Sequence, residues 1–405
     1  FWLKRQLLND TLFGRGPATV GRRAQGHAMA CSLDYMDMQP PSSDFRSTVP
    51  TDDAVRSTHV DAALAKISCA QLGYFEDPFA EQLVRNSRMP QRSPLIHRGY
   101  YSRVAAIRQT VLRFLRDSPP GDGVQIVNLG SGFDTLYFWL RDSPARWRSD
   151  LVYFEVDFPE VLSRKFSAIK KRPNLLPMLD VPSVEALSGE GLSNSGTVEL
   201  RTPHCRFVST DMRMRMDLSD SMTAAGFRED VPTLFIAECV LVYMQALHGD
   251  SIIEWAASSV PRAPSAMVVY EQFNPHDRFG KVMVDNLMRR GCPLLSIHEY
   301  PTLEAQHERY TQRGWDRIAS NDMKTVYSKY LDSADVERIQ RLELLDEFEE
   351  WNLFQSHYFL LIATRTGGPP DSTDASGGGG DAGEREGGLV DAAGSWVHGV
   401  GAALA

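Results

Sequence analysis

The residues of this sequence that most clearly suggest a ligand-binding site lie in one turn. Residues 125–134 read QIVNLGSGFD, in which an apolar run enters a Gly-Ser-Gly turn at the predicted start of a helix. Gly130 and Gly132 lack a Cβ atom, so the backbone can take positive φ there and approach a ligand closely. A dinucleotide fingerprint would need a third glycine where this chain has Thr135. Asp134 places a negative charge near the helix start, which suits a ligand that lacks phosphates or is cationic. The pattern suggests a site for S-adenosylmethionine (SAM), although the glycine turn alone is equally compatible with a structural role.

Acidic residues follow three further predicted strands. Asp157 ends the segment LVYFEVD, Asp211 follows RFVST, and Glu238 lies within the apolar run VPTLFIAECVLVYM. In an open α/β sheet, ligands bind outside the carboxyl ends of the strands. An acid about 25 residues after the glycine turn can accept from both ribose hydroxyls, and the acid after the next strand can accept from an adenine amino group. Each acid alone is better explained as a helix cap or a solvated loop residue. Their common placement favours the SAM site, because clustered carboxylates attract a sulfonium cation.

Alternating strands and helices must position these residues. This alternation predicts a Rossmann-like α/β fold with a mostly parallel, seven-stranded sheet. The run at residues 231–244 is the longest apolar one and predicts a central strand that is buried on both faces. Three predicted helices precede the first strand and would add a helical cap to the sheet. Further strands are predicted at 151–159, 206–212, 266–273 and 356–365, and helices at 136–140, 302–315 and 334–351.

Composition predicts one folded domain between two segments without regular structure. The folded domain extends over residues 51–365, with the helical cap at 51–120 and a Pro-, Ser- and Gly-rich surface insertion at 173–203. Residues 1–50 are predicted to be a disordered basic leader, which is either a transit peptide or an incorrectly extended start. Residues 366–405 are rich in glycine and acidic residues, which predicts a disordered tail.

Composition also argues against several classes of protein. A net charge of -9 argues against a protein built for nucleic acid. No apolar run approaches the roughly 18 residues that a membrane helix needs. The five cysteines contain no CxxC pair and the ten histidines show no HxH or HExxH spacing, so neither a disulfide framework nor a metal site is predicted. We therefore expect a protein of a reducing compartment, the cytoplasm.

Seven segments, taken in order and at compatible spacing, resemble one known family. They read K-x6-GYFEDPF at 66–79, RGYYSRV at 98–104, IVNLGSGFDT at 126–135, YFEVDFP at 153–159, TLFIAECVLVYM at 233–244, YEQFNPHDRFGKVM at 270–283 and RLELLDEFEEW at 341–351. Over residues 60–365 the chain resembles the leucine carboxyl methyltransferase family. The resemblance implies a SAM-dependent enzyme that methyl-esterifies the C-terminal leucine of the protein phosphatase 2A catalytic subunit and so regulates holoenzyme assembly. It implies SAM contacts by Lys66, Arg103, Gly130, Asp157, Asp211 with Met212, and Glu238. Thr210 and Met212 stand where the family pattern reads Ala and Leu, which are conservative changes.

The reaction of this family determines the catalytic prediction. An α-carboxylate has a pKa of about 3.5, so it is ionised at neutral pH and needs no general base. The reaction needs one carboxylate oxygen held in line with the methyl group, with water excluded. A guanidinium matches a carboxylate through two hydrogen bonds, which predicts Arg103 as the clamp and Tyr243 as a supporting hydroxyl donor. Without the family match, Arg103 could be a surface ion pair, Tyr243 a core aromatic residue and Lys66 a solvated helix lysine.

Charge alone predicts where a protein substrate would lie. Asp277, Arg278, Arg289 and Arg290 fall in a segment that could meet an acidic, extended tail. The expected partner is the phosphatase 2A catalytic subunit, through its C-terminal tail and its active-site region. No nucleic-acid or membrane partner is expected, and the protein is expected to be a monomer.

Three other functions stay open. A sister branch of the family modifies a wybutosine precursor in transfer RNA, but its members continue into a propeller of β repeats of which this sequence shows no sign. A methyltransferase of a small-molecule carboxylate is the second alternative. A catalytically dead scaffold that binds the phosphatase tail is the third, and the acids at all the strand ends argue against it.

Overall fold

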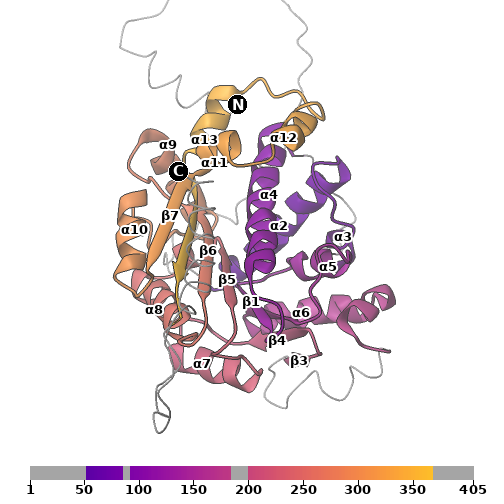
Figure 1. The fold of residues 1–405 in the computed structure, drawn as a ribbon. Coiled ribbons are helices and arrows are strands. Elements are labelled where there is room, and N and C mark those ends of the chain that lie inside the picture. The colour runs from indigo at the N-terminus through magenta and orange to yellow at the C-terminus, as the bar shows by residue number, and fades with distance from the viewer. Residues whose placement is uncertain (1–51, 85–91, 184–198, 368–405) are drawn as a thin grey trace, which may run out of the picture. The chain divides into compact units, whose positions relative to one another are not determined.

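One eight-stranded sheet lies at the centre of the computed structural model, which describes residues 52–84, 92–183 and 199–367. The strand order is β3-β4-β2-β1-β5-β6-β8-β7 (Figure 1). The run from β4 to β6 is parallel, whereas β3 is antiparallel to β4, and β8 is antiparallel to both β6 and β7. The strands are Val124–Leu129 (β1), Leu151–Asp157 (β2), Glu199–Arg201 (β3), Cys205–Ser209 (β4), Thr233–Glu238 (β5), Ser265–Gln272 (β6), Arg317–Asp322 (β7) and Tyr358–Arg365 (β8).

This topology confirms the predicted Rossmann-like α/β fold with a mostly parallel sheet. The described sheet has eight strands rather than the predicted seven. Two of the eight were not located in the sequence: β7 at Arg317–Asp322, and β3, which has three residues and forms an antiparallel pair with β4 at the edge of the sheet. A strand this short carries too few residues for a recognisable period of two in the sequence.

Both faces of the central strands are buried. Along β1, Ile126 belongs to the same hydrophobic cluster as Leu234 of β5, whereas its neighbour Val127 belongs to a second cluster with Phe235. Successive side chains of a strand point to opposite faces, so a strand covered on both faces is apolar at most positions rather than at every second one. This burial on both faces explains the continuous apolar runs in the sequence.

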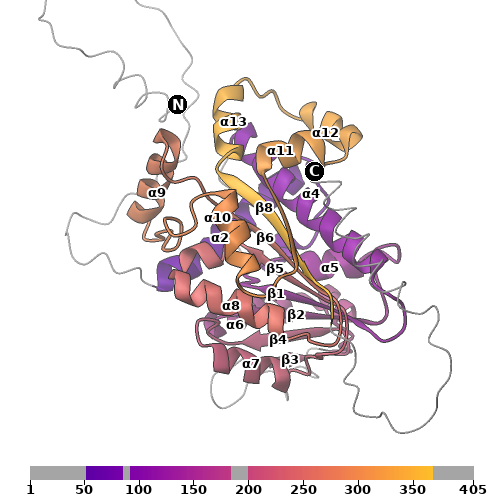
Figure 2. The ribbon, with the colours of Figure 1, turned by 60° about the vertical axis from the view of Figure 1, so that its left-hand side comes forward.

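Helices cover the two faces of the sheet (Figures 1 and 2). On the face of Ile126, buried residues of α4, α5, α6, α11 and α12 join the first cluster. On the face of Val127, buried residues of α7, α8 and α10 join the second. The helices are Asp52–Gln71 (α2), Ala80–Leu83 (α3), Pro94–Asp117 (α4), Leu136–Arg141 (α5), Pro159–Lys170 (α6), Arg215–Ala224 (α7), Ala246–Ser258 (α8), Arg278–Arg289 (α9), Leu303–Thr311 (α10), Met323–Lys329 (α11), Ser333–Gln340 (α12) and Phe348–Gln355 (α13), with 3-10 helices at Pro173–Leu175 (η1), Pro177–Leu179 (η2) and Leu241–Tyr243 (η4).

The predicted strand at 231–244 is shorter than its apolar run. It ends at Glu238, because Cys239 takes a left-handed conformation with φ 57° and the chain then enters η4. The rest of the run stays apolar because Leu241 and Val242 are buried in the loop. The predicted position is confirmed, since β5 lies between β1 and β6 at the centre of the sheet.

The predicted helix at 334–351 is wrong as a continuous element. It consists of α12 and α13, separated by residues 341–347. Arg98 of α4 donates to the carbonyl oxygens of Gln340 at 3.4 Å and Glu343 at 3.1 Å, so it satisfies backbone groups where α12 ends. Leu345, between the two helices, is buried, whereas Phe348 at the start of α13 is 59% exposed.

Several predicted segments lie partly or wholly outside the described residues. These are the leader at 1–50, residues 368–405 of the tail, and residues 184–198 of the insertion. Within the described part of the insertion, Leu175, Leu179 and Leu200 are buried in the core. None of the described helices is long and apolar enough to cross a bilayer.

Candidate functional site

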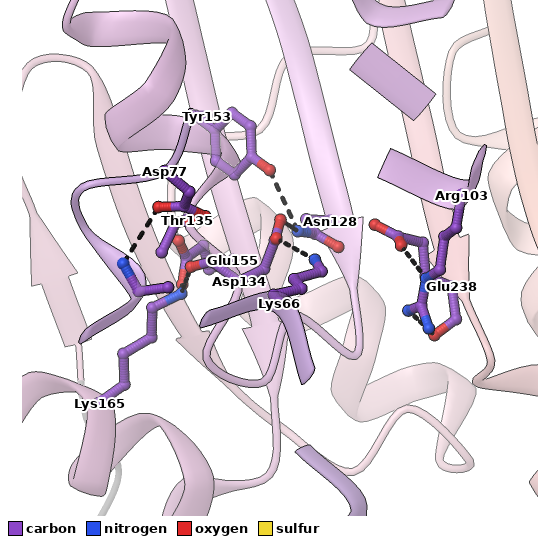
Figure 3. A network of polar contacts seen from close by, with 11 residues as sticks. Lys66, Asp77, Arg103, Asn128, Asp134, Thr135, Tyr153, Glu155, Lys165 and Glu238 are labelled. Atoms are coloured by element: carbon purple, nitrogen blue, oxygen red, sulfur yellow. Dashed lines mark hydrogen bonds and ion pairs between the residues drawn. The ribbon is translucent and has the colours of Figure 1, made fainter. Parts of the chain in front are cut away.

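The carboxyl ends of three adjacent strands form the candidate site. Strand β1 pairs with β2 on one side and with β5 on the other, so the chain order reverses at β1. Such a switch point is where ligands bind in open α/β sheets. Asp157 ends β2 and Glu238 ends β5, on either side of the glycine turn after β1. Helices α2 and α4 add Lys66 and Arg103 to the same region (Figure 3).

The glycine turn needs both of its glycines. Gly130 and Gly132 have φ values of 67° and 50°, in the left-handed region. A Cβ atom on Gly130 would lie 2.6 Å from Cγ2 of Val240, which follows β5, and one on Gly132 would lie 2.9 Å from Cβ of His59 on α2. The turn is therefore in close contact with the end of β5 on one side and with the cap helix on the other.

Replacing Gly130 with alanine is expected to lower the free energy of unfolding by about 2 to 5 kcal/mol. A left-handed residue with a Cβ atom costs about 1 to 2 kcal/mol, and overpacking against Val240 adds about 1 to 3 kcal/mol. Urea unfolding measures the loss. Gly226→Ala is the matched control, because Gly226 also has positive φ, at 82°, but a Cβ atom there meets nothing within 4 Å. Equal losses in the two variants would show that the contact with Val240 is unimportant.

Asp157 is buried and already accepts two backbone hydrogen bonds. Its Oδ2 accepts from the Gly132 N–H at 2.7 Å and its Oδ1 accepts from the Phe158 N–H at 2.7 Å. Burial raises the pKa of Asp157 to about 6, although these two hydrogen bonds act in the opposite direction. Each carboxylate oxygen keeps a second lone pair, so the group can still accept from a ligand. The carboxylate also fixes the glycine turn, which the sequence did not reveal.

Lys66 lies in a buried polar network rather than in solvent (Figure 3). Its Nζ lies 2.8 Å from Oδ1 of Asp134, and Asn128 donates to the other oxygen of Asp134 at 3.0 Å. Burial acts to lower the pKa of Lys66, but Asp134 and Glu238 raise it overall. The same lysine holds the pKa of Asp134 well below its usual range, despite the opposing effect of burial. Asp134, whose charge was expected to face the ligand, is therefore neutralised by Lys66.

Arg103 and Glu238 form the second ion pair of the site. Nε of Arg103 donates to Oε2 of Glu238 at 2.5 Å, and Nη2 donates to the Glu238 carbonyl oxygen at 3.4 Å. The guanidinium also lies 5.0 Å from the ring centre of Tyr270 and 5.8 Å from that of Tyr100. Burial acts against the charge, but Glu238 raises the pKa of Arg103 overall. Arg103 is therefore a mostly buried cation at the site rather than part of a surface pair.

Asp211 and Met212 differ from the other predicted residues. Asp211 lies two residues beyond the end of β4, and its carboxylate turns back to accept from the Arg213 guanidinium, with the shortest contact at 2.7 Å. Its side chain is 33% exposed, whereas Met212 is buried in the core. The Arg213 guanidinium in turn lies over the ring of Phe158, next to Asp157. The pair thus borders the site on the side of β4.

Tyr243 is not at the end of a strand. It belongs to η4 and packs against the small cluster of Val242, Leu294 and Ile297, beside residues of α9. Burial raises the pKa of Tyr243 well above its ordinary value, so the hydroxyl is a donor at neutral pH. Its predicted role as a hydroxyl donor to the substrate stays a prediction.

A fully buried ion pair lies beside the glycine turn and is hydrogen-bonded to it. Lys165 of α6 pairs with Glu155 of β2, and its Nζ also donates to the Asp134 carbonyl oxygen at 2.7 Å (Figure 3). Burial raises the pKa of Glu155 to about 7, although Lys165 acts to lower it. The pair thereby connects α6 to the glycine turn.

Sequence reasoning missed several polar residues of this network. Two of them, Asn128 and Glu155, interrupt otherwise apolar strands, and this interruption was the available signal. Lys165 shows no such signal, because a lysine in a helix is ordinarily solvated. Within the described residues, no group of histidine, cysteine or acidic side chains could hold a metal ion. The missed residues are Asp77, Asn128, Tyr153, Glu155, Lys165 and Glu271, which are hydrogen-bonded within or beside the site.

Known proteins share this sequence pattern. A family model described as leucine carboxyl methyltransferase matches residues 54–257. Leucine carboxyl methyltransferase 1 from Bos taurus is 38% identical over 84% of this chain and 97% of its own length. A leucine carboxyl methyltransferase 1 homolog from Arabidopsis thaliana is 38% identical over 76% of this chain and 89% of its own length. The tRNA wybutosine-synthesizing protein 4 from Homo sapiens is 37% identical over 77% of this chain but only 44% of its own length.

Proposed function

The chain belongs to the leucine carboxyl methyltransferase family, and from this premise we propose that it transfers a methyl group from SAM to the α-carboxylate of a C-terminal leucine. One observation carries the proposal. The structure places a mostly buried arginine, Arg103, beside Glu238 at the switch point of the sheet, within the region that the family model matches. A guanidinium at that position is the group best suited to orient a carboxylate.

The residues of the site fit SAM. Asp157 would accept from the ribose hydroxyls, and Lys66 and Arg103 would attract the carboxylate of the amino-acid moiety. Glu238 would balance the positive charges, and Gly130 and Gly132 leave room for close approach of the backbone. Asp211 and Met212 lie at the end of β4, where an adenine ring is expected. When bound, SAM supplies an electrophilic methyl group on a sulfonium cation.

The chain itself needs only to position the acceptor and exclude water. The leucine carboxylate is ionised at neutral pH, so the protein moves no proton to activate it. Arg103 can hold one or both carboxylate oxygens and leave an oxygen lone pair directed at the methyl group. Helix α2 lies against the glycine turn through His59, whose ring centre is 4.6 Å from that of Phe133. This helix is the element best placed to keep water from the reacting atoms.

SAM affinity is expected to fall by roughly tenfold when the pH is lowered from 8 to 5. The pKa of Asp157 is raised to about 6 in the free protein, and only the ionised form can accept from both ribose hydroxyls. Protonation below pH 6 therefore competes with binding by about one power of ten per pH unit. Calorimetric titrations of SAM at several pH values test this. In Asp157→Asn, affinity should be lower throughout and nearly independent of pH; an unchanged pH profile would assign the titration to another group, such as Glu155.

The protein substrate that we propose is the catalytic subunit of phosphatase 2A. The proposal rests on the resemblance of the whole domain to the family, with the protein acting as a monomer in the cytoplasm. Two of the residues predicted to meet the phosphatase tail have partners within the chain. Asp277 caps α9 through the Gly280 N–H at 2.7 Å and also bonds to His357. Arg290 pairs with Asp61 of α2, so the exposed Arg289 is the better candidate for meeting an acidic tail.

Transfer of labelled methyl from SAM to the purified phosphatase subunit tests the proposal. We expect label on the intact subunit, released by mild base as a methyl ester is, and none on a subunit that lacks its terminal leucine. The similarity to the human wybutosine-synthesizing protein favours one second candidate, a transfer RNA precursor. Label on the nucleic acid, with none on the phosphatase, would favour that function instead.

A further inference from the structure

A buried carboxylate on β6 organises the turn that follows β5. Oε1 of Glu271 accepts from three successive backbone N–H groups, those of Val240, Leu241 and Val242, at 3.1, 2.5 and 3.1 Å. Glu271 is 1% exposed. Three successive N–H groups directed at one point form an anion-binding concavity, or nest. Here the anion is a side chain of the protein itself.

This turn carries residues on which the candidate site depends. It begins directly after Glu238, the partner of Arg103, and ends at Tyr243. Between them, Val240 lies against Gly130, so that the turn touches the glycine turn after β1. A shift of the turn would therefore move Glu238 and the wall of the glycine turn together.

Residues 239–243 form no α-helix or strand that would fix their conformation. Cys239 has φ 57°, which is unfavourable for a residue with a Cβ atom, and its N–H donates to the Tyr270 carbonyl oxygen at 2.7 Å. A single 3-10 turn follows, with only a few hydrogen bonds of its own. Ser296 donates to the carbonyl oxygens of Leu241 at 3.2 Å and Val242 at 3.3 Å, whereas the N–H groups of residues 240–242 all donate to Glu271.

A buried arginine, Arg309, partly compensates the charge of Glu271. Burial raises the pKa of Glu271, whereas the Arg309 guanidinium and the three N–H groups act to lower it. Arg309 is 1% exposed and is itself held by Asp250 at 2.8 Å. The positive charge of Arg309 favours the ionised form of Glu271, which is the stronger acceptor for the three N–H groups.

We propose that Glu271 is a positioning residue for the cofactor site, which acts on SAM binding through residues 239–243 and does not touch SAM itself. The proposal rests on the proposed function, because it assumes that Glu238 and the glycine turn bind SAM. Glu271, a core residue of β6, would thus help to set the geometry of the SAM site. Displacement of a positioned group by about 1 Å can reduce activity by about 100-fold.

The test compares two substitutions of Glu271 with a matched substitution on the same strand. Glu271→Ala removes the acceptor and is expected to weaken SAM binding by about 10- to 100-fold and to lower kcat. Glu271→Gln keeps an amide oxygen for the three N–H groups but loses the charge, so a smaller loss of about three- to tenfold is expected. Met267→Ala creates a core cavity on β6 at a position that pairs with Phe235, away from the turn. It should lower the melting temperature but leave SAM affinity and kcat unchanged.

Circular dichroism establishes which variants are folded, and calorimetry with SAM alone gives the affinities. We expect SAM affinity to fall from wild type to Glu271→Gln and further to Glu271→Ala, and to stay unchanged in Met267→Ala. Wild-type affinity and kcat in a folded Glu271→Ala or Glu271→Gln variant would overturn the proposal. If Glu271→Ala does not fold, the SAM affinities of Glu271→Gln and Met267→Ala are compared to test the proposal. A wild-type chain that binds SAM but methylates no leucine would overturn the proposed function alone, because the affinity comparison needs no acceptor.

Discussion

Replacing Arg103 with methionine is expected to lower kcat/KM for methyl transfer by about two to three orders of magnitude. Charge-assisted hydrogen bonds contribute about 1.5 to 3 kcal/mol each, and a loss of about 3 to 4 kcal/mol corresponds to that factor. Methionine keeps the apolar length of the side chain beside Tyr100 and Tyr270 but removes every donor. Initial rates with a leucine-ended acceptor, at varied concentrations of acceptor and SAM, measure the effect.

Two further variants separate the charge of Arg103 from its geometry. Arg103→Lys retains the charge but loses the two-pronged donor, so an intermediate loss is expected. Glu238 is the partner at 2.5 Å, and removal of either member leaves the other buried without its counter-charge. The double variant Arg103→Met, Glu238→Gln should therefore lose less than the sum of the single losses. Additive losses would show that the two residues act independently.

Replacing Lys165 with methionine is expected to lower the free energy of unfolding by about 3 to 5 kcal/mol, the usual cost of breaking a buried ion pair. Lys165 is fully buried between Glu155 and the Asp134 carbonyl oxygen, so the variant leaves both acceptors without a donor. The loss should grow as the pH rises above about 7. The pKa of Glu155 is already raised to about 7 with Lys165 present and would rise further without it. A raised pKa of an acid in the folded state means stability that is lost as the pH rises through that pKa. Urea unfolding at pH 6 and pH 8 measures both effects.

The control for Lys165 removes both charges. In the double variant Glu155→Gln, Lys165→Met no buried carboxylate lacks a partner, so most of the stability should return and the dependence on pH should disappear. If the double variant is less stable than Lys165→Met, the cost comes from lost packing of the lysine stem rather than from the unpaired Glu155.

The sequence was sufficient to predict those elements that depend on local patterns of residues. The strands β1, β2, β5 and β6 read as apolar runs because helices cover both of their faces. The glycine turn could be recognised because only glycine accepts both the positive φ and the contact with Val240. The placement of Asp157 and Glu238 at one edge of the sheet followed from the rule that parallel strands share their carboxyl ends.

Elements whose ends depend on distant residues could not be predicted in this way. The apolar run at 231–244 contains a strand, a left-handed residue and a 3-10 turn, which are stabilised together by Glu271 from another strand. The break between α12 and α13 coincides with contacts to Arg98 of α4, more than 200 positions earlier in the chain. Periodicity within a segment holds no information about either contact.

The fold class, the edge of the sheet at which the site lies and the types of charged residue near it could be predicted from the sequence. How those charges pair depends on the tertiary structure. Asp134 is neutralised by Lys66, 68 positions earlier in the chain, and Glu238 pairs with Arg103, 135 positions earlier. The reason is physical: hydrophobic periodicity is a property of neighbouring residues, whereas a buried charge must find a partner wherever the folded chain places one.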